Sequence, residues 1–205
     1  MPYNKLPNQS IIQKTTDNLS KLGFQVHIKD SASNALDLIK TLIPANSSVM
    51  NGSSRTLEQI GFVDYLKSGK HGWNNLHEGI VIEKDPQKQS ILRQQALHSD
   101  YYLGSVHALT QSGDIVIASN TGSQLPHITF TSPNVIFVVG AQKIVTDLSD
   151  AMNRLESHVV PLEDENMQQK YQVNTSLSKI LILKHPSPIT NRNFHVILVK
   201  EVLGF

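Results

Sequence analysis

Apolar residues along the chain switch repeatedly between helical and strand-like spacing. In residues 8–22 they fall near one face of a helix, bounded by an Asn or Ser cap and a glycine stop. The run FQVHIKD alternates as a strand does, and residues 31–44 return to helical spacing between a serine cap and Pro44. The short run SSVMNG predicts a buried strand, and TLEQIGFVDYLKSG predicts two short helices broken at Gly61.

The second half of the chain continues this pattern. Residues 84–110 predict helices with two interruptions, and the runs GDIVIAS and NVIFVVG predict strands. Residues 146–172 predict a helix interrupted at Pro161, with its charged residues, Arg154 included, on a solvated face. The last two apolar runs, SKILILKH and FHVILVKEVLGF, are joined by a short loop, so we expect an antiparallel or mixed extension of the sheet.

Strands that alternate with helices predict an α/β fold with a mostly parallel central sheet covered by helices. No change in composition divides the 205 residues. We therefore expect a single domain over residues 1–205, with the helix at about residues 8–22 as a candidate peripheral element.

Composition and charge exclude several classes of function. The net charge is +1 and no basic block is present, so nothing indicates nucleic acid or an anionic membrane as a partner. The absence of cysteine excludes disulfides, thiolate metal sites, bound iron–sulfur clusters and cysteine nucleophiles. The apolar runs are too short to span a bilayer and the first residues lack a signal-peptide pattern, so we expect a soluble, cytoplasmic protein.

Polar segments containing glycine follow two of the predicted strands. In an open parallel sheet, ligands bind outside the carboxyl ends of the strands, so the two segments predict a shared anion site. The competing interpretation of the first is a helix cap beside a solvated arginine, and that of the second is a simple loop. The candidate ligand-binding residues in these segments are Asn51, Gly52, Ser53, Ser54, Arg55, Asn120, Thr121, Gly122 and Ser123.

Three further residues belong to the candidate ligand site. His107 and Thr110 precede the strand GDIVIAS at a predicted helix end, and Lys143 follows the strand NVIFVVG. There the lysine ammonium either reaches the site or lies in solvent. The nine histidines show no metal-binding spacing and no Gly-x-Ser-x-Gly motif occurs, so we expect neither a metal site nor a serine triad.

The order of these segments resembles the LUD (lactate-utilisation) domain family. The resemblance rests on SDYYLGSVHALTQSGDIVIASNTGSQLP, on SPNVIFVVGAQKIVTDLSDAMNRLESHVVPLE and on the closing FHVILVKEVLGF, with NGSSRTLEQIGF as an earlier element. It covers roughly residues 10–205. It implies the fold of glucosamine-phosphate isomerases, ribose-phosphate isomerases and CoA transferases, the NagB/RpiA/CoA-transferase-like fold.

The family resemblance also implies a function. Because the family includes a component of a bacterial L-lactate oxidation system, we expect a role in lactate or organic-acid utilisation. The partners would be an anionic small molecule or iron–sulfur proteins, and a homo-oligomer is a further expectation. By position the resemblance places Ser53, Ser54 and Arg55 in the family's early element at the mouth of the sheet, and His107 and Thr110 in its small, polar segment. It places residues 120–123 in the loop where related enzymes approach phosphate or CoA, and Lys143 in the later segment that matches Gly…Lys-Ile-Val. The resemblance identifies no cofactor.

The alternative function is that of an isomerase or transferase acting on a phosphorylated or CoA-linked substrate. The third hypothesis is a purely structural subunit. The segment SNTGSQLP lacks the glutamate nucleophile that CoA transferases use. An isomerase needs a base, for which Glu78, Glu83 and Asp114 are loosely placed candidates. The sequence leaves open whether the chain is an enzyme.

Overall fold

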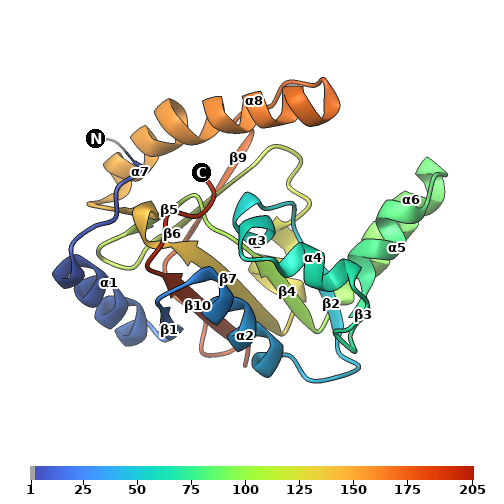
Figure 1. The fold of residues 1–205 in the computed structure, drawn as a ribbon, viewed down its shortest axis with the longest axis horizontal. Helices are drawn as coiled ribbons and strands as arrows, with labels where there is room; N and C mark the ends of the chain where they lie inside the picture. The colour runs from blue at the N-terminus through green and yellow to red at the C-terminus, as the bar shows by residue number, and fades with distance from the viewer. Residues whose placement is uncertain (1–2) are drawn as a thin grey trace.

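Two β-sheets form the centre of the protein, with helices on their outer sides (Figure 1). The computed structural model describes residues 3–205. The larger sheet contains β1 (Gln25–Lys29), β2 (Ser48–Asn51), β3 (Asn74–Asn75), β4 (Tyr101–Gly104), β7 (Asn134–Gly140) and β10 (Asn193–Val199). Its order is β1-β10-β7-β4-β2-β3, and every neighbouring pair is parallel.

The smaller sheet is mixed. It contains β5 (Ala108–Thr110), β6 (Ile115–Ser119), β8 (Ile144–Val145) and β9 (Lys179–Leu183), in the order β8-β5-β6-β9. Strand β6 runs antiparallel to both β5 and β9, whereas β5 and β8 are parallel.

The helices differ in how far they pack on the two sheets. They are α1 (Gln9–Lys21), α2 (Ala32–Leu42), α3 (Arg55–Gln59), α4 (Phe62–Lys67), α5 (Leu76–Ile82), α6 (Pro86–Gln95), α7 (Leu148–Arg154) and α8 (Val160–Tyr171). Two 3-10 turns, η1 (Ala96–His98) and η3 (Ala141–Lys143), and two π turns, η2 (His127–Thr131) and η4 (Leu155–Val159), complete the list. In Figure 1, α5 and α6 project from the body as an arm, and α6 buries no residue. Within residues 3–205, no helix is both long and apolar enough to cross a membrane.

Local sequence explains where several helices begin and end. The side chains of Asn8, Ser31 and Ser54 each accept a hydrogen bond from a backbone N–H in the first turn of α1, α2 and α3. Gly23 follows α1 with φ of 96°, and Gly61 separates α3 from α4 with φ of 78°. Glycine tolerates these left-handed conformations without a steric penalty. The predicted caps and stops of these helices are therefore confirmed.

Alternate residues of the central strands belong to different cores. In β7, Ile136 and Val138 pack against α2, α3 and α4, whereas Val135, Phe137 and Val139 face the opposite side. A strand that is apolar on both faces can lie only where both faces are covered. This explains why β7 and β10 lie within the sheet rather than at its edges.

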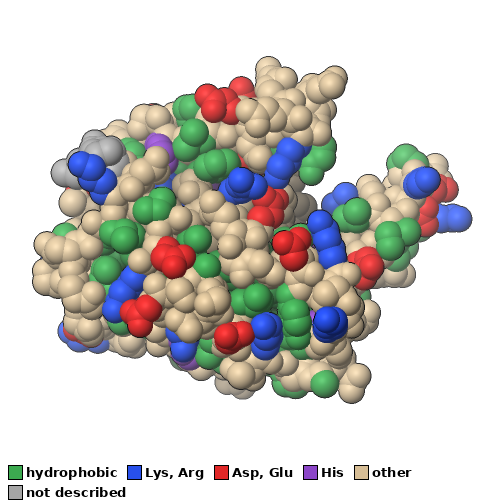
Figure 2. Space-filling view, in the orientation of Figure 1, with side chains coloured by type: hydrophobic (Ala, Val, Ile, Leu, Met, Phe, Trp, Pro, Cys, Tyr) green, Lys and Arg blue, Asp and Glu red, His purple; other side chains and the backbone are tan. Residues whose placement is uncertain are grey.

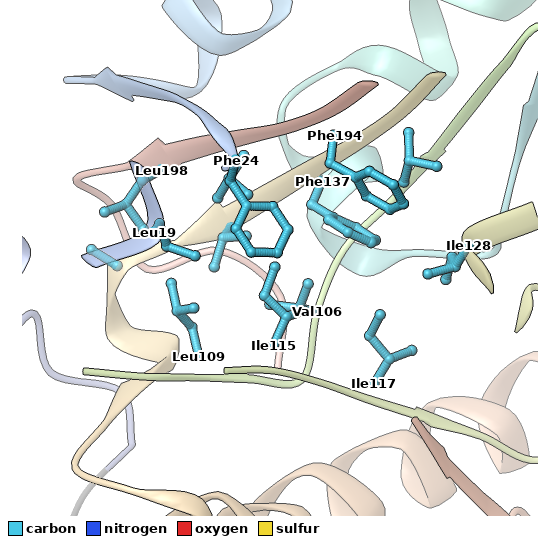
Figure 3. Packing of buried hydrophobic residues seen from close by; sticks show 14 of the residues in the cluster. Leu19, Phe24, Val106, Leu109, Ile115, Ile117, Ile128, Phe137, Phe194 and Leu198 are labelled. Carbon is cyan, nitrogen blue, oxygen red and sulfur yellow. The ribbon is translucent and has the colours of Figure 1, made fainter. Parts of the chain in front are cut away.

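The second sheet covers much of the other face of the central sheet. Figure 3 shows Phe137 and Phe194 of the central sheet directed toward Ile115 and Ile117 of the smaller sheet. Helix α1 adds apolar residues such as Leu19 to this core. A third cluster lies between the smaller sheet and the helical segment of α7 and η4. The layers are thus helices, parallel sheet, mixed sheet and helices.

The α/β class with a mostly parallel central sheet is confirmed, but the helical prediction for residues 84–110 is wrong in its second half. Residues 101–104 form β4 and residues 108–110 form β5. Both strands are short and almost completely buried. Periodicity alone cannot distinguish a short buried strand from a buried stretch of helix. Consequently His107 precedes a strand, and Thr110 lies in it, rather than at a helix end.

The last two apolar runs do not extend one sheet together, so the expected antiparallel or mixed extension is wrong. Strand β9 pairs with β6 at the edge of the smaller sheet, whereas β10 lies between β1 and β7 in the central sheet. Burial explains the separation. Residues 194–199 of β10 are all buried, whereas Ile180 and Ile182 of β9 are exposed.

The chain remains helical through residues 148–171, and the interruption is the π turn η4 just before Pro161. Proline is tolerated there because it lies in the first turn of α8. The expectation that Arg154 lies on a solvated face is wrong, since its side chain is 0 % exposed. Its Nη1 donates to the backbone oxygen of His107 at 2.7 Å, under the mixed sheet.

The central position of β10 predicts a large difference between two isoleucines. Ile197, which is 0 % exposed, should cost about 2–5 kcal/mol of unfolding free energy when replaced by Ala, because a cavity remains in the core. Ile189, which is 89 % exposed, should change it by less than about 0.5 kcal/mol. Urea unfolding followed by circular dichroism measures both, and equal effects would contradict the placement of β10.

Candidate functional site

A cavity of about 360 Å³ lies at the carboxyl ends of β2, β4, β6 and β7. Helix α8 forms one of its walls. Nine of the sequence-predicted site residues line it: Gly52, Ser53, Ser54, Arg55, His107, Asn120, Thr121, Ser123 and Lys143. The two polar segments therefore meet at one cavity, although β6 belongs to the mixed sheet and not to the parallel one.

The other three predicted residues lie outside the cavity lining. Asn51 is buried, and its Nδ2 donates to the oxygen of Gly52. The hydroxyl of Thr110 accepts from the backbone N–H of Asp114 in the turn between β5 and β6. Gly122 has φ of 83° and shapes the loop after β6. These residues hold the backbone around the cavity in place.

Lys143 is the central charged residue of the cavity. It ends the 3-10 turn that follows β7, and its side chain is 3 % exposed. Its Nζ donates to Thr56 Oγ1 at 3.0 Å, to Ser105 Oγ at 3.1 Å and to the oxygen of Val106 at 3.0 Å. The ammonium is thus held by three neutral oxygens from two separate segments.

The charge of Lys143 has no ionic partner. No carboxylate among residues 3–205 forms an ion pair with it. Burial therefore lowers the pKa of Lys143 well below its usual value, and the nearby charge of Arg154 lowers it further. When Lys143 is protonated, no carboxylate among the described residues compensates its charge.

His107 contributes a neutral ring with a fixed tautomer. Its Nδ1 accepts from the backbone N–H of Ala118 at 3.0 Å, so the proton of the neutral ring is on Nε2. Burial lowers the pKa of His107 to about 3, and the charges of Lys143 and Arg154 act in the same direction. At neutral pH this residue is an N–H donor at the cavity and carries no charge.

In the first polar segment, residues 51–55, one serine caps a helix and another lies at the cavity. Ser54 caps α3 by accepting from the N–H of Leu57 at 3.3 Å, and Ser53 is exposed at the cavity. The side chain of Arg55 is 47 % exposed and pairs with Glu58 at 2.8 Å. Its charge is therefore already partnered.

An ion network links the first polar segment to α8. Glu58 also accepts from Lys170 at 3.0 Å, which connects α3 with the far end of α8. Figure 2 shows acidic and basic side chains next to one another over α3, below α8. Hydrogen bonds from Arg55 and Lys170 lower the pKa of Glu58, although burial opposes this shift and is the largest contribution. The network helps to hold α8 against the body of the protein.

Tyr102 and Gln124 support the wall between the two polar segments. The hydroxyl of Tyr102 donates to Gln124 Oε1 at 3.3 Å, and Gln124 Nε2 donates to the oxygen of Ala118 at 3.0 Å. A Cβ at Gly52 would lie 2.5 Å from the Tyr102 hydroxyl oxygen, so a side chain at this position would displace the ring. The glycine thus allows the first polar segment to pass close to Tyr102.

Helix α8 presents three residues to the cavity. Glu163, Met167 and Tyr171 line it and follow one another at intervals of four, which places them on one face of the helix. Burial raises the pKa of Glu163, and Asn166 Nδ2 donates to its Oε2 at 3.1 Å. Glu163 is the one carboxylate among the described residues that line the cavity.

Several residues of the cavity are absent from the site predicted from the sequence. Thr56 directly follows the predicted segment, and Ser105 lies in a stretch whose spacing predicts a helix. Glu163 also escaped notice, although its spacing with Met167 and Tyr171 was visible in the sequence.

None of the three acids considered as bases from the sequence lines the cavity. Glu78 and Glu83 belong to the arm, and Asp114 pairs with Lys184 at 2.8 Å. Among residues 3–205, no three His, Asp or Glu side chains are grouped so that they could hold a metal ion.

Comparison with known proteins identifies the family. The LUD domain family matches residues 12–199, which is most of the chain. The crystal structure of a DUF162 family protein from Deinococcus radiodurans is similar, with a TM-score of 0.59 and 14% sequence identity. The alignment covers 95% of this chain and 99% of that chain, and at this identity it shows the fold alone. No curated protein matches the sequence. The chain therefore belongs to the LUD domain family, named for lactate utilisation.

Proposed function

We propose that this protein binds an anionic small molecule in the cavity and thereby serves in the utilisation of lactate or a related organic acid. The observation that carries the proposal is the buried ammonium of Lys143, which has three neutral oxygen partners and no carboxylate. A buried charge without a counter-charge is unfavourable, and a bound anion would relieve this cost.

The neighbouring groups support the same interpretation. Neutral His107 can donate from Nε2, and the exposed hydroxyl of Ser53 adds another donor at the cavity. Hydrogen bonds from a cation to a carboxylate or phosphate are the stronger class. Lys143 would hold the charge of the ligand, while His107 would fix the orientation of the anionic group.

The protein partners in lactate utilisation are also part of the proposal. Membership of the LUD family supports a role alongside iron–sulfur proteins that oxidise lactate. Because the chain contains no cysteine to ligate a cluster, the partner proteins would carry the electrons.

One observation favours the alternative of an isomerase acting on a phosphorylated substrate. The carboxylate of Glu163 shares the cavity with Lys143 and His107, and burial raises its pKa toward the range of a general base. Such an enzyme would exchange a carbon-bound hydrogen of the substrate with solvent. Sugar phosphates incubated with the protein in deuterium oxide should then incorporate deuterium, as measured by NMR. No incorporation would leave the protein as a binding module.

Replacing Lys143 with Met should weaken anion binding by about 30-fold or more, since a charge-assisted contact in a buried site is lost. Isothermal titration with lactate, gluconate and inorganic phosphate measures the effect, and thermal unfolding checks that the variant folds. Arg55→Ala is the control, because Arg55 is exposed and already pairs with Glu58. It should weaken binding by less than about fivefold. Equal effects of the two substitutions would contradict the role of Lys143.

Anion binding should weaken as the pH rises. The anion binds the protonated form of Lys143, whose pKa is lowered in the free protein and is raised by the bound charge. Below the pKa that Lys143 has in the free protein, the affinity for the anion is constant. Between this pKa and the higher pKa that Lys143 has in the complex, the affinity falls about tenfold per pH unit. Binding therefore takes up protons.

Calorimetric titrations in two buffers of different ionisation enthalpy measure this proton uptake directly. His107 should not contribute above about pH 5, because its pKa is about 3. An affinity that increases with pH, or proton release on binding, would contradict the assignment.

A further inference from the structure

The size of the cavity indicates a ligand larger than lactate. A water molecule occupies about 30 Å³, so the cavity of about 360 Å³ has room for about a dozen waters. Bonded atoms pack more closely than separate water molecules, so a three-carbon acid with about six non-hydrogen atoms would displace fewer than half of these waters. A ligand that displaces most of them needs at least about twice as many atoms.

Two walls of the cavity differ in chemistry. On the side of the sheets, Lys143 offers positive charge, while its three N–H groups are engaged within the protein. His107 offers an Nε2–H donor on the same side. Glu163 on α8 offers a carboxylate, of which only Oε2 is engaged, by Asn166. A carboxylate accepts hydrogen bonds and repels a second anion. The distal part of the ligand must therefore carry donors.

The loop after β6 adds a polar wall, and the hydrogen-bonding groups of this wall are partly satisfied within the protein. Thr121 Oγ1 donates to Ser123 Oγ, and Asn120 Nδ2 donates to Thr175 Oγ1. The oxygens that accept these bonds keep a free lone pair, so the wall can accept from ligand hydroxyls. Ser119 instead accepts from the N–H of Gly122, which leaves its own O–H available to donate. Groups that both donate and accept, as alcohols do, match this wall.

We propose that the cavity takes a polyhydroxylated organic acid of about six carbons, with its carboxylate at Lys143 and its distal hydroxyls at Glu163. The inference rests on the proposed anion site and adds the length and the chemical class of the ligand. It makes Glu163 a specificity residue, which discriminates hydroxylated acids from alkyl acids of equal length.

Three carboxylates test the proposal by isothermal titration calorimetry. Gluconate has the proposed length and hydroxyls, hexanoate has the same chain length without hydroxyls, and lactate is the short acid. We expect gluconate to bind at least about tenfold more tightly than either of the others, because unpaired polar groups penalise a ligand that lacks hydroxyls.

Two variants on α8 assign the preference to one residue. Glu163→Ala should abolish the preference for gluconate over hexanoate, because the variant has neither the carboxylate that accepts from the hydroxyls of gluconate nor the unpaired carboxylate beside hexanoate. Glu165→Ala is the matched control, since Glu165 is an exposed acid on the same helix and lies outside the cavity lining. It should retain the preference of the unmodified protein.

The outcomes separate this inference from the proposed function. If gluconate and hexanoate bind with equal affinity, and both bind more weakly to the Lys143→Met variant, the inference is overturned and the anion site remains. Lactate binding as tightly as gluconate would overturn the assigned length. A gluconate preference that persists in Glu163→Ala would overturn the role of this residue. No binding of any of the three acids would overturn both proposals.

Discussion

The buried ammonium of Lys143 connects the parts of the protein that form the cavity. Its three hydrogen bonds reach the first turn of α3 and the segment between β4 and β5, while the lysine itself follows β7. Neutral oxygens satisfy its N–H groups but leave its charge uncompensated. The positions of α3 and of the β4–β5 segment thus depend on a residue whose charge favours an anion in the cavity.

The layered fold explains how this residue becomes buried. The central sheet is parallel throughout, so the carboxyl ends of β2, β4 and β7 lie at one edge. The mixed sheet brings the loop after β6 to the same place, and α8 closes one side with Glu163. Arg154 beneath the mixed sheet donates to the backbone oxygen of His107, which helps to fix the histidine at the cavity.

Much of this arrangement could be predicted from the sequence, because caps, glycine stops and long apolar runs are local signals. Asn8, Ser31 and Gly61 act as their residue types indicate. The short strands β4 and β5 could not be recognised, since three or four consecutive buried residues show no hydrophobic periodicity that distinguishes a strand from a helix. The burial of Arg154 was likewise hidden, because it depends on the mixed sheet that packs over α7.

The most direct test of the anion site is a crystal structure from crystals soaked in bromide, with the anomalous signal locating the bound ions. We expect a bromide in the cavity within hydrogen-bonding distance of the Lys143 Nζ or the His107 Nε2. Bromide bound only at exposed lysines and arginines, with none in the cavity, would contradict the claim that uncompensated buried charge makes this cavity an anion site.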